Sequence, residues 1–234
     1  MGFDMFSGGA NQATSRLPVY LLLDTSYSMT GAKIQSVNQG VQLIYNELLN
    51  NPTALDTVHI GVITFNSTAR MVTSLTDLTN FVPPILSADG VTALADALSV
   101  LYDSLDRDLI PNSTQQKGDF KPLVFILTDG IPTDSQGYPS DNWRPAIDRI
   151  RSRTKNKVGS IIVLGIGSDQ EIDESVLKGI GDVAMKITDA NPDAIQSFFK
   201  WVSASVGTAS VSAAKGEEGG LQAPAVPNGI QLVI

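Results

Sequence analysis

The chain contains no cysteine and a single histidine, His59, among its 234 residues. Disulfides, thiolate metal sites and cysteine nucleophiles are therefore excluded, and a zinc hydrolase or a histidine-based catalytic triad is not expected. Long apolar runs are also missing: no stretch reaches the roughly 18 uncharged residues of a membrane-spanning helix. The first residues lack the basic segment and apolar core of a secretory signal. We therefore expect a cytoplasmic protein that does not insert into a membrane.

Positive charge is scarce as well. The chain has 16 Lys and Arg against 24 Asp and Glu, a net charge of −8, so binding to a nucleic-acid backbone is not expected. The exception is segment 144–157, which holds six basic residues and one acid. A helix expected over 143–155 would present these residues either as a solvated face or as a surface that steers an acidic partner.

Apolar runs and helical patterns alternate along the chain. Six runs predict strands, at 17–24, 58–65, 69–73, 123–127, 158–166 and 183–187. Helical repeats fall at 34–48, 94–105, 143–155, 174–178 and 195–206. This alternation predicts an α/β fold with a doubly wound, mostly parallel six-stranded sheet and helices on both faces. The short link before 69–73 predicts one antiparallel edge strand.

The composition also predicts where the domain begins and ends. Residues 17–206 are expected to form one domain, between a flexible Gly/Ser-rich lead at 1–16 and a flexible Gly/Ala/Pro-rich tail at 207–234. The apolar end of that tail, residues 230–234, could either pair with a sheet edge or fray.

Oxygen-bearing side chains follow two of the predicted strands and precede one helix. Asp24, Ser26 and Ser28 follow the first run, Asp129 follows the run at 123–127, and Thr92 lies just before a helix. Ligands of open α/β sheets bind beyond the carboxyl ends of the strands, where the strand order reverses. We therefore expect these five side chains at one rim of the sheet.

Such a set of donors, without nitrogen or sulfur, suits a small hard cation. Mg²⁺ takes six oxygens at about 2.0–2.1 Å and tends to keep water, and Mn²⁺ or Ca²⁺ would accept the same donors. Two carboxylates balance the formal charge of a divalent ion and the hydroxyls add none. An open position would therefore favour a carboxylate from outside the chain, which describes adhesion better than hydrolysis.

These elements resemble the metal-ion-dependent adhesion site of von Willebrand factor A domains, over about residues 17–206. Asp24, Ser26 and Ser28 match its first motif, Thr92 its second and Asp129 its third. The resemblance implies that these five residues hold Mg²⁺, some carboxylates acting through water, and that a Glu or Asp of a partner protein completes the shell.

One residue departs from the family pattern, which usually has glycine between the two serines. Tyr27 stands there. It would strain the loop if this position needs a positive φ. Otherwise it is an exposed aromatic side chain available to a partner.

Four segments are similar to bacterial tellurium-resistance-type proteins within that family. They are LPVYLLLDTSYSM, VHIGVITF, FVPPIL and FILTDGIPTD. The likeness implies an adaptor or scaffold in a tellurite-resistance, chemical-stress or phage-defence system. It also implies a phosphatase or kinase of the same gene cluster as a candidate partner.

Two alternatives stay open beside a metal-dependent binding module. One is a structural or self-assembly module whose metal site is vestigial, with Tyr27 blocking the rim. The other is a metal-dependent phosphohydrolase that uses the same acids, although an aspartyl-phosphate phosphatase needs a second acid where Ser26 stands, and no P-loop motif is present. We therefore predict a protein without enzymatic activity. Asp89, Asp96 and Asp134 are candidates for orienting the ligands.

Overall fold

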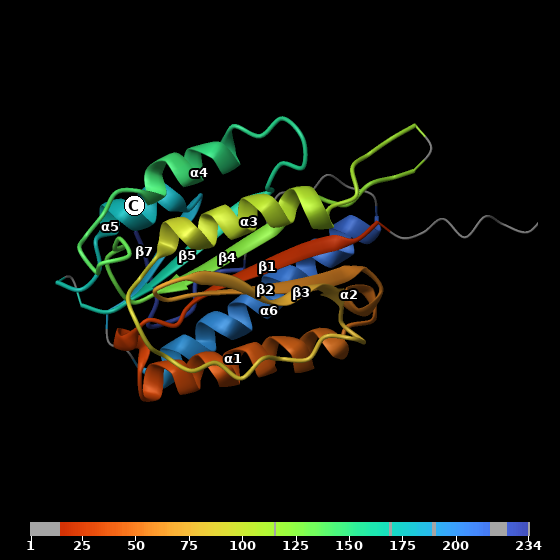
Figure 1. The fold of residues 1–234 in the computed structure, drawn as a ribbon. Coiled ribbons are helices and arrows are strands. Elements are labelled where there is room, and N and C mark those ends of the chain that lie inside the picture. The colour runs from red at the N-terminus through yellow and green to blue at the C-terminus, as the bar shows by residue number, and fades with distance from the viewer. Residues whose placement is uncertain (1–14, 115, 169, 189–190, 216–223, 234) are drawn as a thin grey trace, which may run out of the picture.

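The computed structural model describes residues 15–114, 116–168, 170–188, 191–215 and 224–233. Its middle layer is a seven-stranded sheet, in the order β3-β2-β1-β4-β5-β6-β7, and helices cover both faces (Figure 1). The strands are β1 (Leu17–Asp24), β2 (Val58–Phe65), β3 (Ala69–Asp77), β4 (Leu123–Thr128), β5 (Ser160–Ile166), β6 (Val183–Ile187) and β7 (Gln231–Leu232). The helices are α1 (Ala32–Leu49), α2 (Pro52–Thr57), α3 (Leu94–Asp108), α4 (Trp143–Arg151), α5 (Glu174–Ile180) and α6 (Pro192–Ala214), with a short 3₁₀ turn, η1 (Tyr27–Met29).

The strand order reverses beside β1. β2 and β4 flank β1 and both run parallel to it, and Leu23 of β1 lies opposite Leu127 of β4. Every residue of β1 and β4 is buried, because the helices cover both faces of this central part of the sheet. The register brings Asp24 and Thr128, the last residues of the two strands, to the same edge.

Alternate residues of the central strands enter two separate cores. Leu21 and Leu23 of β1 belong to the core shared with α1 and α6, whereas Tyr20 and Leu22 belong to the core shared with α3, α4 and α5. This is the period of two that a strand imposes on its side chains. The predicted α/β fold with helices on both faces is confirmed. So is the antiparallel edge strand, because β3 runs antiparallel to β2.

The predicted count of six strands is one too few. Leu232 of β7 pairs antiparallel with Met185 of β6, and the N–H of Val233 donates to the carbonyl of Ala184 at 2.9 Å. The tail therefore pairs with the edge of its own sheet. A two-residue strand carries too little periodicity to be recognised from sequence.

The folded part of the chain extends beyond both predicted domain boundaries. α6 continues to Ala214, past the predicted end at 206, because its small residues pack closely rather than form a linker. A Cβ added at Gly207, for example, would lie 3.2 Å from Asn51 Nδ2 at the start of α2. Arg16, assigned to the flexible lead, donates to Asp119 Oδ1 at 2.8 Å. Residues 1–14 and 216–223 of the predicted lead and tail lie outside the described residues.

Within the described ranges, no helix is both long and apolar enough to cross a bilayer.

Candidate metal centre

The site begins with a fully buried carboxylate at the end of β1. Asp24 is 0% exposed; its Oδ1 accepts the N–H of Ser26 at 2.8 Å and its Oδ2 accepts the hydroxyl of Thr128 at 2.6 Å. Burial raises the pKa of Asp24 to about 6, while the hydrogen bonds from Ser26 and Thr128 oppose that rise. These two donors fix the orientation of the carboxylate at the edge between β1 and β4.

A chain of hydroxyl contacts connects β1 to β4. Ser26 Oγ lies 3.0 Å from Ser28 Oγ, and the Ser28 hydroxyl donates to Asp129 Oδ1 at 2.6 Å. Two oxygens that bind one Mg²⁺ at right angles are about 3.0 Å apart, given metal–oxygen distances of about 2.1 Å. The spacing of the two serine hydroxyls therefore fits neighbouring ligands of one ion.

Thr92 joins the same cluster from the segment before α3. A Cβ built on Gly130 would lie 3.4 Å from Thr92 Oγ1 and 3.9 Å from Ser28 Oγ, so both hydroxyls lie against Gly130. The N–H of Thr92 donates to Thr133 Oγ1 at 3.0 Å, and this bond ties Thr92 to the loop after β4. The structure thus brings all five predicted site residues to one edge of the sheet.

The sequence analysis missed one charged member of the cluster. Lys33 Nζ donates to Asp129 Oδ2 at 2.6 Å, and the two side chains are 17% and 0% exposed. Thr128 and Thr133, which hold Asp24 and Thr92, were also missed. The only sequence signal for Lys33 was its place in the first turn of the helix that follows the serines.

The donor set fits a hard divalent cation. No group of three or more His, Cys, Asp or Glu side chains in the described part of the chain is placed to hold a metal. The cluster instead combines two carboxylates, Asp24 and Asp129, with three hydroxyls. All five donors are oxygens, the ligands that Mg²⁺, Mn²⁺ and Ca²⁺ prefer.

Comparison with known proteins places the chain in a family. The model described as von Willebrand factor type A domain matches residues 19–201. The chain belongs to this family. No curated protein sequence matches the chain, so the family assignment rests on that model and on the fold.

Solved structures with a similar fold are distant in sequence. The von Willebrand factor type A structure from Catenulispora acidiphila is 17% identical, with a TM-score of 0.60, over 82% of this chain and 43% of that one. The PilB minor pilin from Streptococcus sanguinis is 17% identical, with a TM-score of 0.60, over 86% of this chain and 63% of that one. The pilus adhesin SpaC from Lactobacillus rhamnosus GG is 16% identical, with a TM-score of 0.61, over 84% of this chain and 31% of that one. The chain thus spans less than two thirds of each, and the likeness supports the fold alone.

Tyr27 is accommodated in this von Willebrand factor type A domain without backbone strain. Among the described residues other than glycine, only Asn156 has a positive φ. Tyr27 instead begins η1, where its N–H donates to the carbonyl of Gly90 at 2.9 Å. Of the two alternatives left open for this position, the strained loop is therefore ruled out. The side chain is 70% exposed and extends from the rim of the site.

Two of the three acids proposed to orient the ligands stabilise nearby loops. Asp89 Oδ1 accepts the N–H of Gly90 at 2.8 Å. Asp134 Oδ1 accepts the N–H groups of Gln136 and Tyr138 at 2.8 and 3.0 Å. Asp96 lies in the first turn of α3. Asp89 and Asp134 thus shape the loops that carry Thr92 and Thr133.

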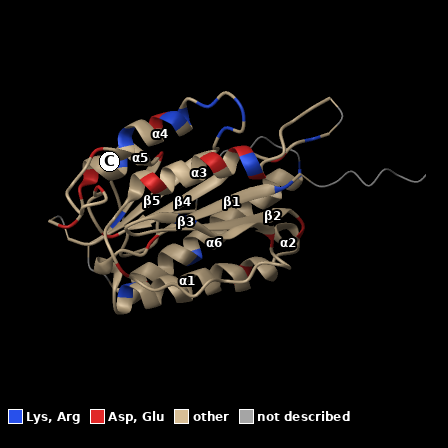
Figure 2. Ribbon diagram, in the orientation of Figure 1, with Lys and Arg blue, Asp and Glu red and all other residues tan. Residues whose placement is uncertain are grey.

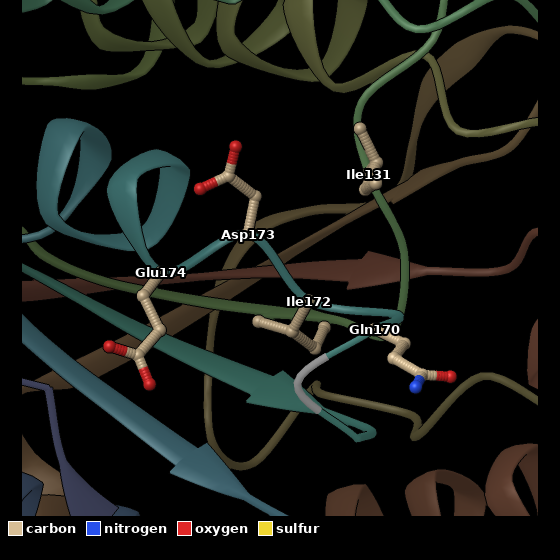
Figure 3. A pocket seen from close by; sticks show the side chains of 5 residues that line it. All are labelled: Ile131, Gln170, Ile172, Asp173 and Glu174. Carbon is tan, nitrogen blue, oxygen red and sulfur yellow. The ribbon is translucent and has the colours of Figure 1, made fainter.

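A surface pocket of about 420 Å³ opens near the site (Figure 3). Its lining residues are Ile131, Gln170, Ile172, Asp173 and Glu174. Ile131 comes from the segment after β4, Glu174 is the first residue of α5, and the other three come from the connection between β5 and α5. Both acids have partners, because Glu174 accepts from Lys186 at 2.7 Å and Asp173 accepts the N–H of Ser175 at 2.8 Å.

The basic segment makes contacts within the domain but stays largely exposed, since Arg153 alone of its six basic residues is buried. Figure 2 shows its charges on α4 and on the stretch that follows, and α4 ends at Arg151 rather than at the predicted residue 155. Arg151 donates to the carbonyls of Gly179 and Ile180 at 2.8 and 3.0 Å. Arg149 and Arg153 lie over the ring of Tyr102 at 4.3 and 4.4 Å. Arg144 also lies over the ring of Trp143 at 4.5 Å, so four of the six basic residues make contacts within the domain.

Proposed function

We propose that this domain is a protein-binding module whose attachment to a partner depends on a divalent cation, Mg²⁺ in the cell, with Mn²⁺ or Ca²⁺ as substitutes. The five residues that hold the ion are Asp24, Ser26, Ser28, Thr92 and Asp129. A Glu or Asp of the partner protein completes the ligand shell. The observation that carries the proposal is the hydrogen-bonded chain Ser26–Ser28–Asp129, which joins β1 to β4 where the strand order reverses.

Neighbouring residues of the chain would orient the ligands of such a site. Thr128 and the Ser26 backbone hold the Asp24 carboxylate in one orientation, and Thr133 fixes the backbone at Thr92. When bound, the ion would supply a positive centre for a carboxylate from outside. Neutral hydroxyls supply three of the five donors and add no negative charge, so an open position on the ion remains available to that carboxylate.

The proposal includes the absence of enzymatic activity. His59, the only histidine of the chain, is the second residue of β2 and its Nδ1 lies 3.3 Å from the carbonyl of Thr57. The site lies beyond the opposite end of the strand, roughly 20 Å away at about 3.3 Å per residue. His59 is therefore too distant to act as a base on a nucleophile bound at the site.

The cellular setting is a further part of the proposal. The sequence likeness to tellurium-resistance-type proteins supports an adaptor in a bacterial tellurite-resistance, stress or defence system, located in the cytoplasm. An acidic surface residue of a phosphatase or kinase from the same gene cluster is the corresponding partner contact.

Metal binding is the first test. We expect the wild-type protein to bind one Mn²⁺ saturably, as measured by electron paramagnetic resonance of the free ion. The double variant Ser26→Ala/Ser28→Ala should lose at least tenfold in affinity, because it removes two neighbouring donors. The matched control Ser99→Ala/Ser197→Ala removes two helix hydroxyls that bond to their own helices and should bind as the wild type does. Equal affinity in both double variants would overturn the proposed site.

Partner capture is the second test. A protein retained from lysate by the wild type in Mg²⁺, but released by EDTA and not retained by Ser26→Ala/Ser28→Ala, would establish attachment through the ion. A partner retained in EDTA and by the double variant would show that another surface binds it.

A further inference from the structure

Lys33 is a charged side chain of the cluster to which the proposed function gives no role. Its ammonium contacts Asp129 at 2.6 Å, and the Asp129 side chain is fully buried. The other carboxylate, Asp24, is also fully buried, and its hydrogen bonds in the described structure come from neutral donors. The cluster therefore holds two buried carboxylates and one ammonium, a formal charge of −1.

We propose that Lys33 acts as an internal competitor of the metal ion and thereby makes the loaded site dependent on an acidic partner. This inference rests on the proposed function. A divalent ion added to the cluster brings its formal charge to +1 while Lys33 remains, and one outside carboxylate returns it to zero. Without the ammonium, the loaded site would already be neutral and would attract that carboxylate less.

The competition follows from the geometry at Asp129. One oxygen of this carboxylate accepts from Ser28 and the other from Lys33, so an ion bound to the cluster meets a carboxylate that is already paired. Ammonium and metal ion also repel each other. At separations of a few ångströms this repulsion corresponds to about tenfold or more in metal affinity, even with the screening of water.

The ammonium also protects the protein without metal. A buried carboxylate that loses its only charged partner destabilises the fold. Lys33 therefore stabilises the site when the ion is absent, at the expense of affinity when it is present. The same residue has opposite effects on the stability of the metal-free protein and on metal retention.

The test measures Mn²⁺ affinity in four proteins at low salt. Lys33→Met should bind Mn²⁺ about tenfold more tightly than the wild type. Lys33→Arg keeps the charge and should stay close to the wild type, and Lys200→Met, which removes an exposed lysine of α6, should match it. The difference in Mn²⁺ affinity between Lys33→Met and the wild type should decrease as salt is added, because salt screens the repulsion. Lys33→Gln serves as a second neutral variant if Lys33→Met fails to fold.

Two further measurements address the partner and the metal-free state. Glutarate, used as a probe carboxylate, should raise the Mn²⁺ affinity of the wild type more than that of Lys33→Met, because linkage makes the coupling reciprocal. In EDTA, Lys33→Met should melt several degrees below the wild type.

If Asp24→Ala abolishes Mn²⁺ binding but Lys33→Met leaves the Mn²⁺ affinity unchanged, this inference is overturned and the proposed function stands. If neither the wild type nor Lys33→Met binds Mn²⁺, both are overturned.

Discussion

At the residue scale, the rim of the site carries an exposed aromatic side chain beside the five side chains proposed to hold an ion. Tyr27 lies between the two serines in sequence, yet its backbone is bonded to Gly90 and its ring extends into solvent. It supplies no oxygen to the cluster. Large exposed aromatic side chains next to a polar anchor are frequent sources of binding energy at protein interfaces.

We expect Tyr27→Ala to weaken partner capture several-fold while Mn²⁺ affinity and thermal stability stay close to those of the wild type. A surface substitution without buried contacts usually changes stability by at most about 0.5 kcal/mol. The measurement compares pull-down yield with Mn²⁺ affinity for the same preparation. Ile85→Ala, which truncates a side chain that is 94% exposed between β3 and α3, is the control. Loss of Mn²⁺ binding in Tyr27→Ala would show that the tyrosine supports the ion site instead.

The gathering of the five oxygen-bearing side chains at one edge could be predicted from sequence, because strand ends fix where Asp24 and Asp129 emerge. The position of Lys33 could not be predicted in this way. Its contact with Asp129 depends on the angle at which α1 leaves the site, which is set by packing against the sheet and α6. Thr133 was missed for a similar reason, since it reaches Thr92 only through the fold of its loop.

At the element scale, α1 and α6 approach each other closely at a glycine. A Cβ on Gly40 would overlap the ring of Phe199, so the two helices have no room for a larger residue there. Both helices contribute to the core under one face of the sheet (Figure 1). The helix pair therefore depends on a single small residue in α1.

We predict that Gly40→Ala lowers the free energy of unfolding by about 1–3 kcal/mol, as overpacked cores do. The clash outweighs the roughly 1 kcal/mol that alanine gains over glycine in a helix. Urea denaturation followed by circular dichroism measures the change. Gly207→Ala in α6 is the matched control, since its added Cβ meets only the end of the Asn51 side chain. A Gly40→Ala protein as stable as the control would contradict this account of the packing.

Periodicity predicted the long helices but not every element. α2 has six residues, and its start is fixed by the Asn51 side chain, which accepts the N–H groups of Thr53 and Ala54. A helix this short shows no repeat. The end of α6 was misjudged because glycine, alanine and serine are typical both of linkers and of closely packed helices.

At the scale of the whole molecule, the C-terminal residues close one edge of the sheet. Besides the β6–β7 pairing, Ile230 is buried in the core with α6. Trp201 Nε1 donates to the carbonyl of Pro224 at 2.9 Å. The end of the chain thus belongs to the folded domain, on the far side of the sheet from β3. The alternation of strands and helices predicted the fold class, but strand order and this closure arise from long-range contacts.

Removal of residues 216–234 should lower the free energy of unfolding by about 2–4 kcal/mol. The deletion exposes the apolar surface covered by Ile230 and leaves the Trp201 indole without its acceptor. Mn²⁺ affinity should persist, because the five proposed donors lie at the end of β1, in the turn that follows it, before α3 and after β4. Urea denaturation measures the change in the free energy of unfolding, and Mn²⁺ titration measures the metal affinity. Unchanged stability would show that β7 adds nothing to the domain, and Ile230→Ala should reproduce part of the loss.

One helix, α1, links the candidate metal centre to α6. Lys33 lies in the first turn of α1, and Asn38 in the same helix holds Leu86 through paired hydrogen bonds of 2.8 and 3.0 Å. Leu86 belongs to the segment that leads to Thr92. Phe199 of α6 presses on the opposite flank of α1. α1 is therefore the element through which Lys33, the segment that leads to Thr92 and α6 are connected by direct contacts.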